Sequence, residues 1–129
     1  MKYMLLMESN KQAWDDMPKL WSDEDIKVMV DFMHDLNREL QDSGELVEAR
    51  GLTGPDNMKT VRAQDDGEPI ITDGPFSETK EVLAGYWVVD VASEERAVEL
   101  ALRISRTPGP GGRPLNQVVE VHPEGVAPA

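Results

Sequence analysis

Asp73 is the residue whose chemical type and setting most clearly permit catalysis. It ends a short apolar segment, residues 69–72, and precedes Gly74 and Pro75. The Asp-Gly and Gly-Pro pairs predict a sharp turn, because Gly74 tolerates a positive φ and Pro75 fixes its own φ while restricting the residue before it. Such a turn can present a carboxylate at a strand end, or use that carboxylate to accept a backbone N–H. The sequence leaves both roles open, general acid or base and turn residue.

Several side chains close to this turn in the sequence could complete an acid–base site. A carboxylate between an apolar wall and a basic residue can act as a general acid or base, because both neighbours shift its pKa. Phe76 and the segment holding Trp14 and Trp21 could supply the wall, while Lys80 or Arg62 could orient an anionic group. We therefore predict Asp73 as a catalytic residue, and as binding residues Arg62, Gly74, Pro75, Phe76, Lys80, Glu81 and Tyr86.

His34 is a second catalytic candidate. It lies four residues after Val30, at the edge of the apolar stripe of a predicted helix. A histidine at such a position is more often a boundary residue than a base, so its structural and catalytic interpretations both stay open.

Other kinds of site lack their sequence patterns. The chain has no cysteine, which excludes disulfides, thiolate nucleophiles and zinc–thiolate sites. Its two histidines do not have the spacing of paired metal ligands, and no Gly-x-Ser-x-Gly motif is present. The glycine-rich segment 109–112 lacks the Lys-Ser/Thr pair of a phosphate-binding loop. We expect neither a bound metal nor a cofactor.

The charge of the chain limits its partners. The 129 residues carry a formal net charge of −12 at pH 7, which disfavours binding to nucleic acids and to anionic membrane surfaces. The sequence lacks an 18-residue apolar segment and a signal-peptide pattern, so we expect a cytoplasmic protein. Its length predicts one domain, residues 1–123, followed by a flexible C-terminal tail, residues 124–129.

The first half of the chain predicts a strand, an irregular segment and a long helix. The apolar run 2–7 is typical of a buried strand. Pro18 opposes a long helix within residues 11–21, which we expect to form a loop or irregular helix covering a core edge or a pocket. Ser22 and Asp25 have the spacing of a capping box, and Gly44 ends the helix that follows. This helix has an apolar stripe of Ile26, Met29, Val30, Met33, Leu36 and Leu40.

The second half predicts strands at residues 45–52, 83–91 and 115–121, and an inserted hairpin of residues 60–64 and 69–72, which places Thr72 and Asp73 beside the main sheet. Ser93 caps a second helix, whose apolar face holds Ala97, Leu100, Ala101 and Ile104. The glycine- and proline-rich segment 107–114 is predicted to be neither helix nor strand. Two helices then cover one face of an antiparallel sheet. Because the aromatic and valine residues of 86–89 cannot all face the helices, we expect a second copy of the chain to cover the other face.

The central motif resembles a known family signature. Residues 73–76 (Asp-Gly-Pro-Phe), 78–81 (Glu-Thr-Lys-Glu) and 85–86 (Gly-Tyr) are similar to the DGPF branch of the YCII-related family, as are residues 1–6 and 60–62. The resemblance covers residues 1–122. It implies a ferredoxin-like βαββαβ fold with an inserted hairpin, pairing into a dimeric α+β barrel. It also implies bacterial origin and genomic association with extracytoplasmic-function sigma factors. Smaller relatives carry a helix histidine proposed to act with an aspartate, a residue that the DGPF branch generally lacks.

Two functions follow as hypotheses from different classes. The first is a cofactor-independent lyase or isomerase acting on a small organic anion, with Asp73 as acid or base. The second is a non-catalytic module that binds a ligand or regulates a partner in sigma-factor signalling. An enclosed pocket containing Asp73 and a basic residue favours the enzyme, whereas a shallow, open surface with Asp73 held in backbone hydrogen bonds favours the module or a purely structural motif.

Overall fold

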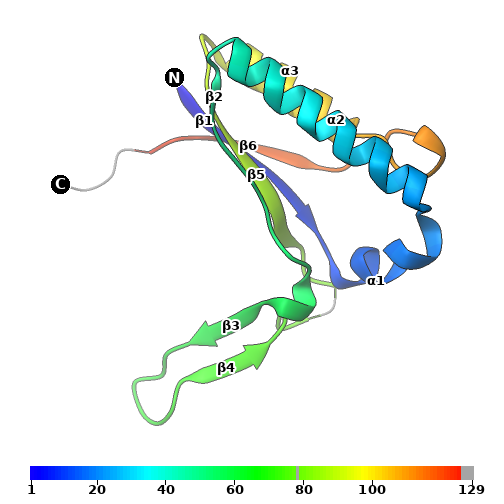
Figure 1. Cartoon of the computed structure of the whole chain (residues 1–129). Helices are drawn as coiled ribbons and strands as arrows, with labels where there is room; N and C mark the ends of the chain where they lie inside the picture. Colours follow the sequence, from blue (N-terminus) through cyan, green and yellow to red (C-terminus); the bar gives the residue numbers. More distant parts are fainter. Residues whose placement is uncertain (78, 126–129) are drawn as a thin grey trace.

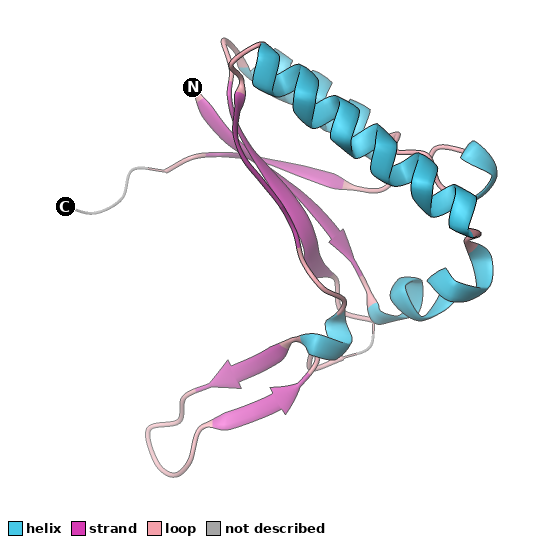
Figure 2. Cartoon of the chain, in the orientation of Figure 1, coloured by secondary structure: helices cyan, strands magenta, loops and turns pink. Residues whose placement is uncertain are grey.

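Four antiparallel strands form the main sheet of the computed structural model, which describes residues 1–77 and 79–125. The strands are β1 (Lys2–Ser9), β2 (Leu46–Gly51), β5 (Val82–Asp90) and β6 (Val119–Pro123), in the order β2-β5-β1-β6. Helices α2 (Asp23–Asp42) and α3 (Glu94–Ser105) lie on one face of this sheet (Figure 1, Figure 2). The arrangement is the predicted ferredoxin-like α+β fold. Glu78 of the motif and residues 126–129 of the predicted tail lie outside the described residues.

The two long helices begin at the residues that the sequence predicts. The Ser22 hydroxyl accepts a hydrogen bond from the Asp25 N–H, and the Asp25 carboxylate accepts one from the Ser22 N–H, both at 3.0 Å. Gly44 has a φ of 78° just after the end of α2, which is the left-handed conformation that terminates helices. The Ser93 hydroxyl caps α3 by accepting from the Arg96 N–H at 3.2 Å. These local contacts confirm the capping predictions.

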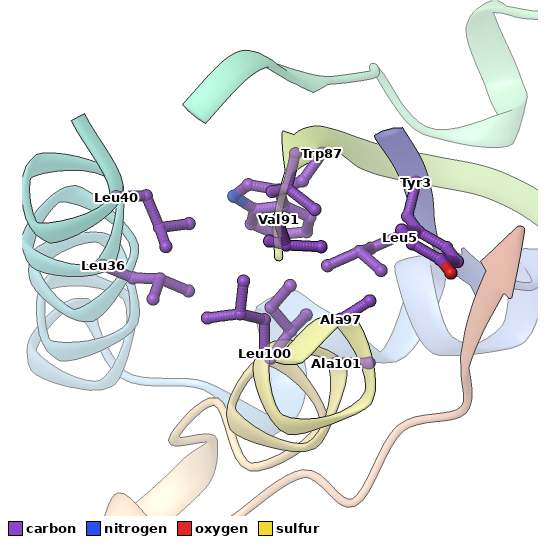
Figure 3. Packing of buried hydrophobic residues seen from close by; sticks show 11 residues of the cluster. Tyr3, Leu5, Leu36, Leu40, Trp87, Val91, Ala97, Leu100 and Ala101 are labelled. Atoms are coloured by element: carbon purple, nitrogen blue, oxygen red, sulfur yellow. The ribbon is translucent and has the colours of Figure 1, made fainter. Parts of the chain in front are cut away.

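The hydrophobic core lies between the helices and the sheet. Strand side chains alternate between the two faces of a sheet, so Leu5 and Trp87, which are paired in the β1–β5 register, both point toward the helices. Leu36 from α2 and Leu100 from α3 meet them there (Figure 3). All four residues of the predicted α3 face are buried, namely Ala97, Leu100, Ala101 and Ile104. Among the α2 stripe residues, Leu36 and Leu40 are buried, whereas Val30 is 36% exposed.

Among the described residues, no helix covers the other face of the main sheet. The paired residues Met4 and Val88, and the next pair, Leu6 and Tyr86, point to this face because their strand neighbours point to the helices. All four side chains are half-buried in the single chain. An apolar sheet face of this kind favours contact with another surface.

The inserted hairpin forms a sheet of its own. Strands β3 (Lys59–Arg62) and β4 (Ile70–Asp73) pair only with each other among the described residues. The hairpin extends from the end of the main sheet, away from the helix layer (Figure 1). Thr72 and Asp73, which we predicted to lie beside the main sheet, pair within the described residues with Thr60 and Lys59 of the hairpin and not with a main-sheet strand. The 3-10 helix η1 (Pro55–Asn57) redirects the chain before β3, so the hairpin strands do not reach a main-sheet edge.

Residues 11–20 differ from the irregular segment that Pro18 predicted. They form a regular helix, α1 (Lys11–Leu20), with Pro18 inside it. Asn10 caps this helix by accepting a hydrogen bond from the Ala13 N–H at 2.9 Å. Proline removes its own N–H donor and its ring crowds the preceding turn, but Pro18 lies in the last turn of α1, so these effects fall just before the helix ends.

The C-terminal strand begins four residues later than predicted. Residues 115–118 precede β6 because the Leu115 N–H donates to the Thr107 carbonyl and the Gln117 N–H donates to the Ser105 carbonyl. These backbone bonds tie the segment to the end of α3 rather than to β1. The glycine-rich loop also contains a short 3-10 helix, η2 (Pro110–Gly112), where we predicted neither helix nor strand.

Candidate functional site

A cavity of about 710 Å³ lies beside the core, between helices α1 and α2 and the helix-covered face of the sheet. All three tryptophans of the chain line it, together with four of its seven methionines. Cavities of this size, mostly apolar with a few polar groups, are the usual form of small-molecule sites. The aromatic and thioether lining consists of Trp14, Trp21 and Trp87 with Met7, Met17, Met29 and Met33.

Small residues on the sheet make room for the cavity. Ala49 pairs with Trp87 and Gly51 pairs with Gly85 in the β2–β5 register, so all four belong to the cavity face. A Cβ atom at Gly85 would lie 3.0 Å from the Arg50 carbonyl oxygen, so the close approach of these two strands requires glycine there. The sheet floor is therefore hollow where β2 ends and β5 begins.

Helix α1 forms the wall opposite this floor. Ala13, Asp16, Met17 and Leu20 line the cavity at a spacing of three, one and three residues, which places them on one helix face. No residue of α1 is buried. Helix α1 therefore covers the cavity without being part of the hydrophobic core, and its own residues are partly or fully exposed to solvent.

The polar groups of the cavity are few and mostly held in place. The Trp87 indole N–H donates to Asn37 Oδ1 at 2.8 Å. Gln117 Nε2 donates to the Glu8 carbonyl oxygen at 3.0 Å. Asp16 Oδ1 accepts from Gln12 Nε2 at 2.9 Å. Polar groups fixed in this way can orient a bound molecule whose remaining surface is apolar.

Asp73, the predicted catalytic carboxylate, lies on the hairpin and points to solvent. Its side chain is 83% exposed, and it forms an ion pair with Lys59, its direct partner in the β3–β4 register. The hydrogen bond and the positive charge of Lys59 lower the pKa of Asp73. Among the described residues, Asp73 does not line the 710 Å³ cavity or a second, 410 Å³ cavity near Glu81. The sequence analysis missed Lys59, although counting the hairpin register back from Asp73 would have found it.

The turn after Asp73 has a structural function that is directly visible. Gly74 has a φ of 81°, which a residue with a Cβ adopts at a cost. Its N–H donates to the Met58 carbonyl and its own carbonyl accepts from the Thr60 hydroxyl, both at 2.8 Å. A Cβ at Gly74 would also lie 3.7 Å from the Pro55 carbonyl oxygen. The turn therefore fastens the base of the hairpin to η1.

The base of the hairpin in turn contacts the cavity wall. The position of a Cβ atom at Gly54, the residue before η1, lies 3.0 Å from the Trp14 indole. Lys11 of α1 also lies 3.4 Å from the Asp56 carboxylate of η1. A continuous series of contacts thus runs from the Asp-Gly-Pro turn through η1 to Trp14 in the cavity.

The other residues predicted for binding are dispersed. The Arg62 guanidinium lies 5.6 Å from the centre of the Phe76 ring, in a cation–π contact on the hairpin. Tyr86 points to the uncovered face of the main sheet. Lys80 is exposed, and Glu81 lines the second cavity. The described protomer does not bring these side chains together around Asp73.

His34 and Pro75 also lie apart from the large cavity. His34 is exposed on α2 and, within the described ranges, lines neither cavity. Pro75 is half-buried next to the buried Gly74. The acid–base roles of Asp73 and His34 remain predictions without a shared pocket in this protomer.

The described part of the chain offers neither a metal-binding cluster nor a membrane-spanning helix. Within residues 1–77 and 79–125, no three His, Cys, Asp or Glu side chains come close enough together to hold a metal ion. Over the same residues, no helix combines the length and the apolar character needed to cross a membrane.

Comparison with known sequences gives the family. A sequence model of the YCII-related domain matches residues 1–109. The chain belongs to the YCII-related family. It is also 37% identical over 86 residues to an uncharacterized protein of Rhizobium meliloti (strain 1021), a match covering 66% of this chain and 68% of that protein. In this YCII-related chain, the matched residues 1–109 include all three tryptophans of the cavity and the whole of α1. Membership of the DGPF branch remains a resemblance.

Proposed function

We propose that this chain is a binding module for a small, largely apolar organic molecule held in the 710 Å³ cavity. The observation that carries the proposal is the concentration of every tryptophan and most of the methionines around one hollow. Tryptophan offers a large apolar surface with one polar group, and methionine adapts its shape to different ligands. A core that only needed filling would not leave such side chains around an open space.

The position of Asp73 supports binding over catalysis by that residue. An efficient general acid or base has a pKa close to the working pH, whereas Lys59 moves the pKa of Asp73 downward, away from neutrality. The carboxylate also lies outside the cavity lining. Asp73 is exposed, which agrees with the open surface expected for the module, although its side chain pairs with Lys59 and not with the backbone groups that the sequence led us to expect.

The test is a fluorescence titration with N-phenyl-1-naphthylamine, a neutral apolar probe that brightens when it leaves water. The blocking variant is Gly51→Phe. A Cβ at Gly51 meets nothing within 4 Å and points to the cavity face, so the phenyl ring enters the open space without backbone strain. The matched control is Val61→Phe on the hairpin, where the native side chain is 64% exposed.

We expect the native chain and Val61→Phe to bind the probe equally, and Gly51→Phe to bind it about tenfold more weakly, because part of the hollow is filled. Circular dichroism melting checks that both variants fold. Equal probe binding by Gly51→Phe and the native chain would refute the cavity as the binding site.

We also propose that the chain forms a homodimer through the uncovered sheet face. This face has an apolar centre formed by the paired residues Met4, Leu6, Tyr86 and Val88. A second copy of the same chain could cover it without any other protein. Light scattering at micromolar concentration should give twice the chain mass. Leu6→Glu should shift it to the monomer mass, and a monomeric native chain would contradict the proposal.

A further inference from the structure

Among the described residues, two charged side chains line the cavity, Asp16 and Arg50. They differ in whether they could pair with a bound ligand. Arg50 pairs with Tyr86 in the β2–β5 register, so its side chain belongs to the face opposite the helices. Its guanidinium donates to the Glu48 carboxylate there at 2.8 Å. The positive charge is therefore both compensated and directed away from the cavity.

Asp16 differs from Arg50 on both points. Its side chain belongs to the α1 face formed with Ala13, Met17 and Leu20, all of which line the cavity. Asp16 is half-buried. Its Oδ1 accepts from the neutral Gln12 amide, and no ion pair joins Asp16 to any described residue. Within the described residues, the carboxylate on the cavity face of α1 therefore has no basic side chain paired with it.

We infer that the ligand of this cavity is an apolar cation, whose positive group lies against Asp16 and whose body packs on the tryptophans. This inference rests on the proposed binding function. Trp14 and Trp21 line the same cavity as Asp16, and indole faces attract cations while also covering apolar surface. A carboxylate in a partly desolvated, aromatic setting recognises a cation more strongly than the same pair does in water.

The overall charge of the chain does not explain this preference by itself. The formal net charge of −12 attracts any cation to the surface, but that attraction is spread over the chain and screened by salt. The neighbouring residue Asp15 provides the comparison, because it is exposed and already paired with Lys11 at 2.7 Å. Removing either carboxylate changes the net charge equally, and only Asp16 lines the cavity.

The experiment compares two probes of the same shape and opposite charge, tetraphenylphosphonium and tetraphenylborate, by isothermal titration at 150 mM salt. We expect the native chain and Asp15→Asn to bind the phosphonium about tenfold more tightly than the borate. Asp16→Asn should remove this preference, and Asp16→Lys should reverse it. Melting curves of all four proteins establish that each is folded.

Three results overturn the inference. The borate binds the native chain as tightly as the phosphonium, or Asp16→Asn keeps the preference shown by Asp15→Asn, or neither ion binds. In each case the neutral probe N-phenyl-1-naphthylamine distinguishes failure of the cation preference from failure of the proposed binding function. If the native chain binds the neutral probe and Gly51→Phe binds it about tenfold more weakly, only the cation preference is refuted. If the native chain does not bind the neutral probe either, the proposed function is refuted as well.

Discussion

The hairpin is the most recognisable part of the sequence, whereas the cavity wall is the part of the structure best suited to bind a ligand. The hairpin carries the Asp-Gly-Pro turn, yet Asp73 there is exposed and paired with Lys59. The cavity carries no recognisable motif, yet it gathers all three tryptophans from α1, the residue after it and β5. The turn has a clear role in shape, while the hollow has the properties of a binding site.

The contrast teaches how a local motif can serve a distant site. The turn fastens the hairpin base to η1 through Gly74, and Gly54 beside η1 contacts Trp14 in the cavity wall. A motif that fixes backbone geometry can therefore matter for binding without contacting a ligand. Matched substitutions in the hairpin and around the cavity should therefore have different effects on stability and on binding.

The largest difference should appear in stability. Leu36 is 2% exposed in the core, whereas Val61 is 64% exposed on the hairpin. We expect Leu36→Ala to lower the free energy of unfolding by about 2–5 kcal/mol, and Val61→Ala to lower it by less than about 0.5 kcal/mol. Urea denaturation measures both. A cost above 2 kcal/mol for Val61→Ala would mean that the hairpin packs on another surface, such as a second copy of the chain.

Glu45 and Asp73 are both carboxylates whose pKa a basic partner lowers, but Glu45 is mostly buried and Asp73 is exposed. Glu45, 17% exposed, accepts hydrogen bonds from Arg96 Nε and Nη2 at 3.0 and 2.9 Å. These bonds, with a smaller contribution from Ser43, lower the pKa of Glu45 below its ordinary 4.5. We expect Glu45→Gln to cost about 2 kcal/mol at pH 7, and Asp73→Asn to leave the melting temperature unchanged because Asp73 is exposed.

The loss of stability caused by Glu45→Gln should depend on pH in one direction only. A carboxylate whose pKa is lowered by folding stabilises the folded state fully above its unfolded pKa, and loses that contribution as pH falls through the folded pKa. The stability gap between the native chain and Glu45→Gln should therefore be complete above pH 4.5 and close at lower pH. A gap that stays constant from pH 7 to pH 3 would show that the ion pair is not its source.

Much of the fold follows from local sequence rules. The capping box of Ser22 and Asp25, the Gly44 terminus and the apolar face of α3 were all predictable, because each depends on residues within about one helical turn. The open sheet face also followed from strand alternation. The position of the hairpin did not, because it depends on how η1 redirects the chain.

The site was harder to predict for a physical reason. Its lining comes from α1, α2, β1, β2, β5 and the segment before β6, so no spacing within one element marks it. The nearest signal was the α1 face of Ala13, Asp16, Met17 and Leu20, which Pro18 concealed by opposing a helix. The residues that were predicted, around Asp73, share sequence proximity to a turn rather than a common surface.

The smallest effect should connect the two regions. A Cβ at Gly54 would press on the Trp14 indole at 3.0 Å, whereas a Cβ at Gly51 meets open space. We expect Gly54→Ala to displace Trp14, shift tryptophan emission and weaken binding of the neutral naphthylamine probe by about threefold, which is well under 1 kcal/mol. Gly51→Ala should leave both unchanged. Identical behaviour of the two variants would separate the hairpin base from the cavity.

The most direct measurement reads the same probe titration through the protein's own tryptophans. Because Trp14, Trp21 and Trp87 all line the cavity, a probe bound there should accept their excitation energy. The account predicts that tryptophan emission of the native chain falls in step with probe binding, and that Gly51→Phe shows both changes only at about tenfold higher probe concentration. Probe binding that leaves the tryptophan emission untouched would place the ligand elsewhere and contradict the account.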